Sequence, residues 1–500
     1  MRKYPAFLFF IFFILGEITS LIYRNIPNPD AVIIIFTLIM LLKISKMKTK
    51  YIAAFIAGYI ALAVNIYHYE NNIKTLKNIN IKNKKEALIY KINESKHSKI
   101  LYALLIQKNK KTNIKILIFA PKKTKISKNS KIIFSQKLKF PENKKNYIRY
   151  LSKNICAFTY LNNKNFKIIP PEKNIQPLTE KIKNKIKNIL TFGFSSKKEA
   201  NIYAALTIGE RNTIPVCLKD IFKNTNTYHI FSISGLHFAS IVVFLIWFLN
   251  IARINNNLKI AIIIISSLFY LHITEYRIPS MRAFIMALLF ILSNNFHREN
   301  TALNSLGASG VIILLLFPYS LFSAGFMLSF LAVSGILITN TYLKNIFINE
   351  KTPFEKIKGK ISLKKHIIRK TYKYFLICLA AWFFTSPVIL YFYGKTSLSS
   401  IILNMAIIPL ISLTIQISII SLLAGLIFKP LSTFPNKIAQ LIIHTAIKIV
   451  NLTDKNFNIV LSGDKTLIFI LVFLIIGLFT AFFIYEEKIK FPVQEKPPMS

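Results

Sequence analysis

Residues 227–240 read Thr-Tyr-His-Ile-Phe-Ser-Ile-Ser-Gly-Leu-His-Phe-Ala-Ser, and residues 241–249 continue as Ile-Val-Val-Phe-Leu-Ile-Trp-Phe-Leu. A polar cluster therefore runs directly into an apolar segment of membrane length. Polar side chains are costly in a bilayer, about 2.5–3.5 kcal/mol for each charged residue, so they normally face a protein interior or a water-filled path. This stretch predicts the wall of a site or of a pore.

The composition around this stretch is that of a membrane protein. Of 500 residues, 53% are hydrophobic, and the mean hydropathy is +0.45; soluble proteins carry about 45–50% apolar residues. Several apolar runs reach the ~17–25 residues that a helix needs to cross a bilayer. We therefore expect a polytopic α-helical membrane protein with about 10–12 spans.

The predicted spans form two blocks. The first comprises residues 5–23, 31–44 and 51–67, and the second 230–249, 259–273, 279–293, 302–317, 321–339, 373–392, 398–428 and 465–485. The stretch 398–428 is too long for a simple crossing, and Pro409 predicts a re-entrant pair or a kinked helix there. Residues 436–453 have the pattern of an amphipathic helix.

Two basic loops indicate the topology. Residues 43–50 and 340–371 are rich in Lys and Arg, as cytoplasmic loops are. Residues 4–23 lack a small-residue cleavage site, so they are predicted as an uncleaved first span with the amino terminus inside. Residues 71–185 then lie outside the cytoplasm, and the protein is predicted in the cytoplasmic (inner) membrane.

Residues 71–185 predict a separate extracytoplasmic domain, inserted after the third span. It holds 29 Lys and Arg against five Glu, a net charge of +24. Short apolar runs alternate with polar turn clusters, which is typical of a small all-β barrel or sandwich. The predicted strands are residues 87–90, 100–106, 114–120, 132–134, 155–160 and 166–169.

The basic charge has two explanations. A net charge of +46 indicates a polyanionic partner such as nucleic acid or anionic lipid, whereas an A+T-rich coding genome would enrich Lys everywhere. The outer domain accordingly either binds single-stranded nucleic acid through phosphate contacts and base stacking or carries an ordinary solvated Lys-rich surface.

The predicted layout is 1–70 for three helices, 71–185 for the β domain, 186–229 for interfacial helices, 230–486 for the membrane domain and 487–500 for a tail.

The cluster His229, Ser232, Ser234 and His237 contains the residue types of Ser/His nucleophilic chemistry. Ser234 and His237 would share a helix face, but no Gly-x-Ser-x-Gly elbow is present. Pore lining or helix packing is the preferred interpretation, with a satisfied polar interior and an intramembrane Ser-dependent hydrolase as alternatives. No nucleotide-binding loop or metal-ligand motif appears, so neither cofactor, metal site nor catalytic residue is predicted.

Other polar residues occur at the ends of spans or inside them. Arg277 and Arg282 flank Pro279, which suits the first turn of a helix, and either steer phosphates at a membrane mouth or act as snorkelling anchors. Small residues such as Ser329 predict close helix contacts, and Ser386-Pro387 predicts a break in a span. Acidic residues are scarce in the spans after Glu17, which disfavours a proton-coupled pump. A small-solute permease is a further alternative.

An ordered set of motifs resembles the ComEC family of competence proteins. The first is Ala204-Ala-Leu-Thr-Ile-Gly-Glu-Arg211 followed by His229-Ile-Phe-Ser-Ile-Ser-Gly-Leu-His237. In the same order follow Ile278-Pro-Ser-Met-Arg-Ala283, the run Ser323-Ala-Gly-Phe-Met-Leu-Ser-Phe-Leu-Ala-Val-Ser-Gly335, Thr385-Ser-Pro387, Tyr391-Phe-Tyr-Gly394 and Leu403-Asn404. The resemblance covers about residues 200–430, and the amino-terminal part matches by layout only.

The resemblance implies a cytoplasmic-membrane channel that admits single-stranded DNA during natural transformation, with an OB-like outer domain. The residues expected along the DNA path are Glu210, Arg211, His229, Ser232, Ser234, Gly235, His237, Arg277, Pro279, Arg282, Ser329, Ser386, Pro387 and Asn404. Many family members also carry a carboxyl-terminal metallo-β-lactamase-like domain, whose ligand pattern this chain lacks. The expected partners are therefore single-stranded DNA, the lipid bilayer, a separate nuclease, a DNA receptor and a cytoplasmic translocation motor.

Overall fold

The fold is given by a computed structural model. It describes residues 4–24, 49–79, 85–94, 98–107, 110–122, 124, 126–141, 147, 150–161, 166–170, 178–295, 301–349, 363–463, 466–468, 470–472 and 474–479. The predicted span 31–44 and the tail 487–500 lie outside these residues. The chain divides into two compact units: Met1–Leu8, Lys185–Gly310 and Met327–Ser500 form one, and Phe9–Asn184 with Val311–Phe326 forms the other.

The second unit combines membrane helices with a β-sheet. Helix α1 is Pro5–Arg24 and helix α3 is Thr49–Ile79. The third predicted span ends at residue 67, but α3 continues for 31 residues, or about 46 Å. This length exceeds the ~30 Å hydrocarbon core of a bilayer, and the carboxyl-terminal half of α3 is polar.

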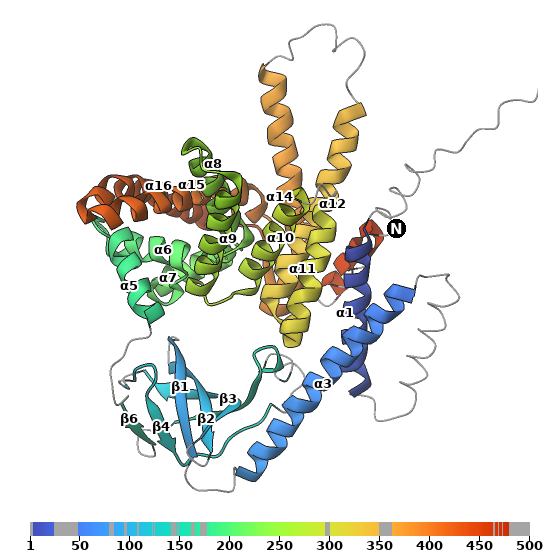
Figure 1. Ribbon diagram of the computed structural model, residues 1–500, viewed down its shortest axis with the longest axis vertical. Helices are drawn as coiled ribbons and strands as arrows, with labels where there is room; N and C mark the ends of the chain where they lie inside the picture. Colours follow the sequence, from blue (N-terminus) through green and yellow to red (C-terminus); the bar gives the residue numbers. More distant parts are fainter. Residues whose placement is uncertain are drawn as a thin grey trace, which may run out of the picture. The chain divides into compact units, whose positions relative to one another are not determined.

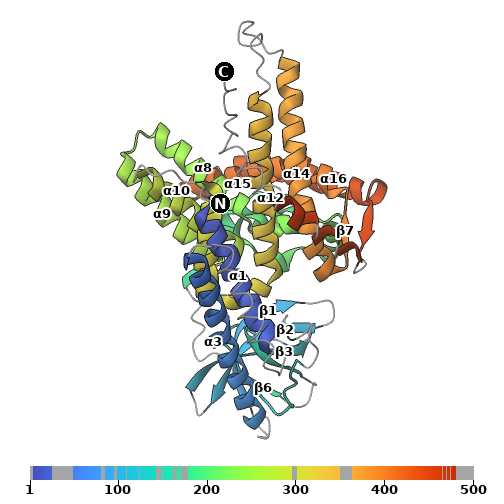
Figure 2. The ribbon, with the colours of Figure 1, turned by 90° about the vertical axis from the view of Figure 1, so that its right-hand side faces the viewer.

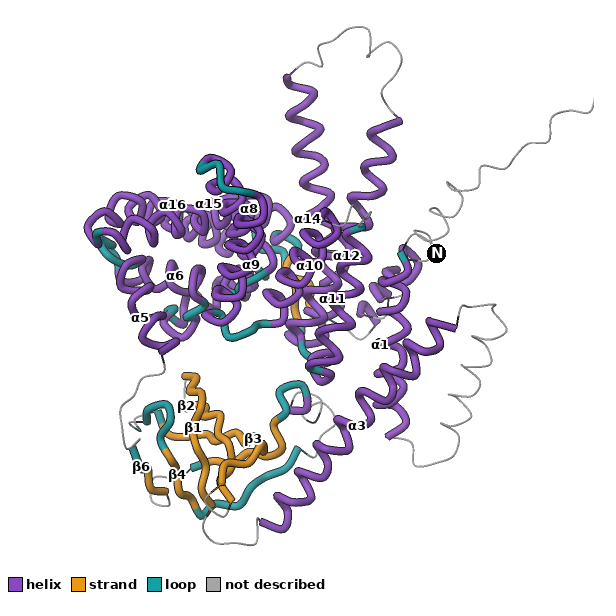
Figure 3. Tube along the Cα trace, in the orientation of Figure 1, coloured by secondary structure: helices purple, strands orange, loops and turns teal. Residues whose placement is uncertain are grey.

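Six strands form one sheet in the order β5-β3-β2-β1-β4-β6, drawn in orange in Figure 3. All six predicted strands are confirmed: β1 Lys85–Glu94, β2 Ser98–Gln107, β3 Lys110–Pro121, β4 Lys131–Phe134, β5 Ile155–Tyr160 and β6 Phe166–Ile169. Neighbours are antiparallel except β3 and β5, which are parallel. After β4 the chain returns to β5, where Lys139 N donates to Phe158 O at 2.7 Å and Phe158 N to Lys139 O at 2.9 Å.

Helix α3 packs on this sheet (Figure 1). The buried Tyr69 hydroxyl donates to the carbonyl of Ile155 in β5 at 2.7 Å, and the Tyr69 ring lies 6.1 Å from that of Tyr319. One hydrogen bond from a fully buried tyrosine thus joins a membrane helix to an edge strand, because the phenol needs a partner when buried.

The first unit is helical apart from a two-stranded antiparallel sheet of β7 (Lys395–Ser397) and β8 (Val460–Ser462). Its helices are α5 Leu178–Leu190 (from Lys185), α6 Lys197–Ile208, α7 Val216–Asn224, α8 Gly235–Ile251, α9 Asn256–Ile273, α10 Ile278–Asn295, α11 Ala302–Leu316 (to Gly310), α12 Ala324–Asn349 (from Met327), α14 Leu363–Tyr393, α15 Ser400–Ile427 and α16 Thr433–Asn456. Among the described residues, four helices are long and apolar enough to cross a membrane, in α9, α12, α14 and α15, and five shorter apolar helices accompany them. The polytopic α-helical class is therefore confirmed.

Of the two alternatives expected at Pro409, a re-entrant pair or a kinked helix, the re-entrant pair is wrong. Helix α15 runs without interruption from Ser400 to Ile427, with Pro409 inside it, and α14 likewise contains Pro387. A proline removes one backbone hydrogen bond, and membrane helices tolerate this where neighbours satisfy the freed group. At 28 residues, α15 is about 42 Å long.

Close contacts fix the helix pairs of this unit. A Cβ atom on Gly335 in α12 would lie 2.7 Å from a ring carbon of Phe384 in α14, so glycine lets these two helices lie side by side (Figure 2). Asn436 of α16 is fully buried, donates to the carbonyls of Ile189 and Phe192 at 2.9 Å each, and accepts from the Ser421 hydroxyl. It thereby satisfies carbonyls at the end of α5.

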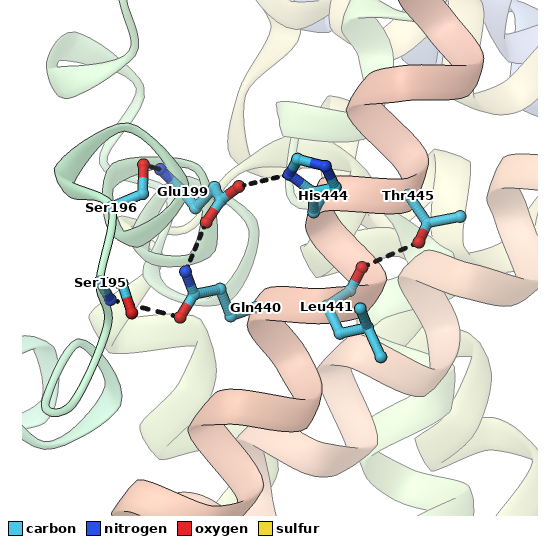
Figure 4. Close-up of polar contacts among 7 residues, drawn as sticks. All are labelled: Ser195, Ser196, Glu199, Gln440, Leu441, His444 and Thr445. Carbon is cyan, nitrogen blue, oxygen red and sulfur yellow. Dashed lines mark hydrogen bonds and ion pairs between the residues drawn. The ribbon is translucent and has the colours of Figure 1, made fainter.

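A second polar contact joins α6 to α16 (Figure 4). Ser196 begins α6, and Glu199 in its first turn accepts from Gln440 Nε2 at 2.7 Å and contacts His444 Nδ1 at 2.9 Å. Glu199 is buried, so both of its oxygens are provided with donors as a buried carboxylate requires. These contacts hold α6 and the loop after it in place.

Candidate functional site

The candidate site is built where α6 ends and α8 begins. Gly209 ends α6 in the left-handed conformation, with φ of 79°, which glycine adopts without strain. The chain then passes through the 3₁₀ turn η1 (Arg211–Thr213), α7 and the 3₁₀ turn η2 (Tyr228–Phe231) before α8. Figure 1 shows α6, α7 and α8 together in this unit.

One arginine ties η1 to η2, and a second ties the end of α6 to the turn before α10. Arg211 Nε donates to the carbonyl of Phe231 at 2.7 Å, and Arg277 Nη2 donates to the carbonyl of Gly209 at 3.1 Å. A Cβ on Gly209 would lie 3.2 Å from the same Arg277 nitrogen. Glycine therefore provides both the backbone turn and the space for the guanidinium.

His237 completes the start of α8. Its Nδ1 accepts from the backbone N–H of Ser234 at 3.2 Å and lies 2.8 Å from the Ser234 hydroxyl. This is the return contact of a capping box, with histidine in the usual place of Glu or Gln. Because Nδ1 is the acceptor, the neutral ring carries its hydrogen on Nε2.

The site has buried donors without acceptors. Among the described residues, His237 Nε2 and Arg277 Nη1 are buried and lack a hydrogen-bond partner. Both are donors, and buried donors of this kind are costly unless an acceptor reaches them. Arg211, Arg277 and His229 are electrostatic neighbours of His237. We call these four residues, of which the two arginines carry the positive charge, the cationic cluster.

The charge of the cationic cluster is only partly balanced. Burial, and then the neighbouring Arg277 guanidinium, lower the pKa of Arg211 to about 10, and burial lowers the pKa of Arg277 while Glu275 opposes the change. Glu210, predicted on the DNA path, is paired instead with Lys187 of α5 at 2.5 Å. The arrangement therefore favours a bound anion that accepts hydrogen bonds.

Aromatic side chains lie beside the cationic cluster. Tyr228 interacts electrostatically with both arginines, and Tyr393, at the end of α14, interacts with Arg211. Tyr393 is 64% exposed. Flat aromatic surfaces beside cations suit nucleobases next to phosphates.

A second group is packed around Arg282. Its guanidinium donates to the carbonyl of Ser329 in α12 and lies 6.0 Å from the ring of Phe330, and it fills the space that a Cβ on Gly235 would occupy. Arg282 is only 6% exposed. Arg282 is the fifth residue of α10, near the end of its helix as predicted, but neighbouring helices enclose its guanidinium. A snorkelling anchor would be exposed, so that alternative differs from the structure, and the role of a phosphate guide stays a prediction.

Apart from His229 of the cationic cluster, the remaining predicted residues are separate from both groups. Pro279 is the second residue of α10, so it lies in the first turn of a helix, as predicted. Ser232 follows η2. Exposed His229 donates from Nδ1 to the carbonyl of Asn226 at 3.2 Å. Ser386 and Pro387 lie in α14 and Asn404 in α15; no hydrogen bond joins them to either group in the described part of the chain.

Three contributors to the site were not predicted. Gly209 stands inside the quoted motif, and its place before Glu-Arg at a helix end was a usable signal. Tyr228 adjoins a predicted residue, while Tyr393 lies more than 150 positions from Arg211, a separation that no local pattern bridges. We find no cluster of three or more metal-ligating side chains among the residues that were searched.

The helices and this site define a multi-pass membrane protein with a partly buried cationic centre. The family model described as "Competence protein" matches residues 206–488, more than half of the chain, and contains both groups. The chain belongs to the competence protein family, as its motifs implied.

The chain is also similar to two curated proteins. An uncharacterised protein of Aquifex aeolicus is 28% identical over 277 residues, which is 55% of this chain and 58% of the relative. ComE operon protein 3 of Bacillus subtilis is 25% identical over 225 residues, 45% of this chain and 26% of the relative. The chain thus matches less than two thirds of either relative's length. No solved structure matches.

Proposed function

We propose that this protein is a channel of the cytoplasmic membrane that carries single-stranded DNA into the cell during natural transformation. The observation that carries the proposal is the cationic cluster, in which buried donors of His237 and Arg277 lack acceptors. Phosphodiester oxygens are acceptors with negative charge, so a DNA strand supplies what these groups need. Family membership supports the same substrate.

The cationic cluster binds the sugar-phosphate backbone of the DNA strand. Such contacts do not depend on the base sequence. Arg211 and Arg277 contact phosphates, while Tyr228 and Tyr393 offer ring faces to the bases. Neither kind of contact reads base edges, so the channel accepts strands of any sequence. A strand moving through the site exchanges one phosphate for the next at the same donors.

The β domain captures DNA outside the cell in this proposal. Tyr160 of β5 is 53% exposed, its ring stacks on Phe119 with centroids 4.8 Å apart, and Lys139 Nζ lies 5.7 Å from its centroid. An exposed ring next to a cation is the arrangement that OB-like domains use for single strands. The sheet, which is rejoined after β4 by the Lys139–Phe158 bridge, is compatible with such a domain.

The partners follow from what the chain is proposed to do. A separate nuclease removes the second strand, a receptor delivers the DNA, and a cytoplasmic motor assists its movement. Binding of each would be measured by co-purification with the full-length protein from membranes.

The Ser234–His237 contact of 2.8 Å favours a second candidate, an intramembrane hydrolase. Its chemistry is weaker, because an imidazolium at His237 would form near Arg211, Arg277 and His229, which are electrostatic neighbours, without a carboxylate to orient it. Covalent labelling of Ser234 by a serine-directed probe would support the hydrolase; an unlabelled Ser234 would reject it.

Labelled-DNA uptake in a deletion strain tests the channel. Arg277→Gln removes one of the two arginine charges of the cationic cluster and three of the five N–H donors of that side chain, and we expect uptake to be lost while the protein still reaches the membrane. Arg253→Asn is the matched control, because Arg253 is exposed at positive φ, where asparagine is tolerated. Equal uptake by both variants and the wild type would reject the assignment of the site.

A further inference from the structure

Glu17 is an acidic residue inside α1 that the proposed channel does not use. It is 0% exposed, and neither carboxyl oxygen has a hydrogen-bond partner among the described residues. The 20 residues of α1 cover about 30 Å, the thickness of a hydrocarbon core. Glu17 lies about 4 Å along the axis from the middle of the helix.

The carboxyl group lies on the face of α1 that packs on α3. At Phe13, the carbonyl oxygen of α1 occupies the space that a Cβ on Gly58 would need. Glu17 follows Phe13 by one helical turn and therefore shares its face. Ala54 and Leu62, one turn to either side of Gly58, are both 0% exposed, so this helix contact is dry and apolar.

No cation is paired with the carboxyl group among the described residues, and the basic residue of α1 is Arg24, two turns beyond Glu17. Residues 51–65 of α3 contain no charged side chain, and their titratable groups are Tyr51 and Tyr59. In α1, residues 5–23 contain no Lys, Arg or His. Across residues 311–326 of the same unit, the titratable group is Tyr319, whose hydroxyl donates to the carbonyl of Asn65.

An ionised carboxylate is therefore not the form that this site holds. An unpaired buried charge costs several kcal/mol, which protonation removes. A carboxyl group inside a membrane span normally serves the movement of ions or protons, since an apolar residue would fill the same space at less cost. We propose that Glu17 is an intramembrane proton-binding site, neutral as a carboxylic acid, that releases and regains its proton during DNA uptake.

The uptake half of this inference rests on the proposed channel function, whereas proton binding does not. In each cycle the O–H bond of the carboxyl group breaks, the proton passes to water, and the carboxylate later takes up another proton. The proton is not consumed, and no further reactant is needed. The scarcity of acidic residues in the later spans disfavours a pump that uses several carboxyl groups. The proposed proton site uses one carboxyl group, which lies in the first span.

Dicyclohexylcarbodiimide tests the protonated state. The carboxylic acid gives its proton to a carbodiimide nitrogen while its oxygen adds to the central carbon, and the adduct rearranges to a stable N-acylurea. We expect mass spectrometry of the full-length protein in liposomes to find the label on Glu17 at neutral pH and less of it at alkaline pH. Glu86, which is paired with Lys131 at 2.6 Å in the β domain, is the ionised control.

Either of two labelling results would overturn proton binding: no adduct on Glu17, or adducts on Glu17 and Glu86 to the same extent. Because no DNA is present, this outcome is independent of the channel proposal.

Uptake of labelled DNA tests proton release. Glu17→Gln keeps the shape and neutrality of the acid but has no proton to release, so we expect most uptake to be lost at an unchanged amount of protein in the membrane. Glu17→Asp keeps the chemistry and should retain part of the uptake. Full uptake by Glu17→Gln would show that Glu17 is only a neutral packing group. If the wild type imports no DNA while Glu17 is labelled, the channel function fails and the proton site stands.

Discussion

Gly235 at the start of α8 lies against the guanidinium of Arg282 in α10, whose Nη2 fills the space of a Cβ atom. The same guanidinium donates to the carbonyl of Ser329 in α12. Three motifs that are separate in the sequence thus meet at one buried cation. A buried cation needs hydrogen-bond acceptors and close packing. A change of any one of these three residues therefore alters the packing or the hydrogen bond of the other two.

Gly235→Ala tests this contact. The added methyl group must displace Arg282, and we expect a loss of about 1–3 kcal/mol in stability, as overpacking typically causes, together with reduced DNA uptake. Thermal unfolding of the purified protein in detergent measures the first effect. Gly325→Ala is the control, because nothing lies within 4 Å of its Cβ position.

Coupling between the two residues distinguishes displacement from a general helix effect. Arg282→Lys leaves room beside residue 235, so Gly235→Ala should cost less in that background than in the wild type. Equal costs in the two backgrounds, or equal stability of the two Gly→Ala variants, would contradict the contact.

Gly209→Ala tests the turn that ends α6. The residue has φ of 79° and its Cβ would lie 2.7 Å from Ile233 Cδ1 and 3.2 Å from Arg277 Nη2. Gly394 has φ of 77° and nothing within 4 Å of its Cβ position, so Gly394→Ala reports backbone strain alone, about 1 kcal/mol. We expect Gly209→Ala to lower the thermal midpoint more; equal shifts would show that Arg277 does not depend on the glycine.

The strands and most membrane helices were predictable because their signals are local. Alternation of apolar residues between polar turns identified β1 to β6, and apolar length identified the spans. Pro409 misled because its local effect, one missing hydrogen bond, was outweighed by the surrounding membrane helix. The end of α3 was missed because the predicted bounds, residues 51–67, followed the apolar run alone. The helix itself continues through polar residues to Ile79.

The site was predictable only as a set of residues. The motifs named Arg211, His237 and Arg277, but not the hydrogen bonds between Arg277 and Gly209 or between Arg211 and Phe231, which join residues across 68 and 20 positions. Arg282 was placed near solvent because a long cationic side chain usually snorkels. Its burial depends on Gly235 and Ser329, which only the folded chain brings together.

Tyr160→Ala tests DNA capture by the β domain. Loss of one stacking ring costs about 1–3 kcal/mol in binding, or roughly 5- to 150-fold in Kd for single-stranded DNA. Tyr160→Phe keeps the ring and should bind like the wild type. Fluorescence anisotropy with the full-length protein in nanodiscs measures both, and equal affinity of the Ala and Phe variants would reject the stacking role.

Asn436→Ala tests the junction of α5 with α16. The substitution leaves the carbonyls of Ile189 and Phe192 without their 2.9 Å donors, and each buried unsatisfied group costs about 1–3 kcal/mol. We expect a lower thermal midpoint than for Asn257→Ala, a change at an exposed residue near the start of α9. Indistinguishable midpoints would show that Asn436 does not hold the two helices together.

Photocrosslinking during DNA uptake tests the central claim most directly, namely that the strand passes the cationic cluster. A p-benzoylphenylalanine in place of Tyr393, which is 64% exposed beside Arg211, should form a crosslink to the imported labelled strand. The same group in place of Phe269, 48% exposed on α9, should not. Uptake that proceeds without a crosslink at position 393, or with equal crosslinks at both positions, would contradict the proposed path.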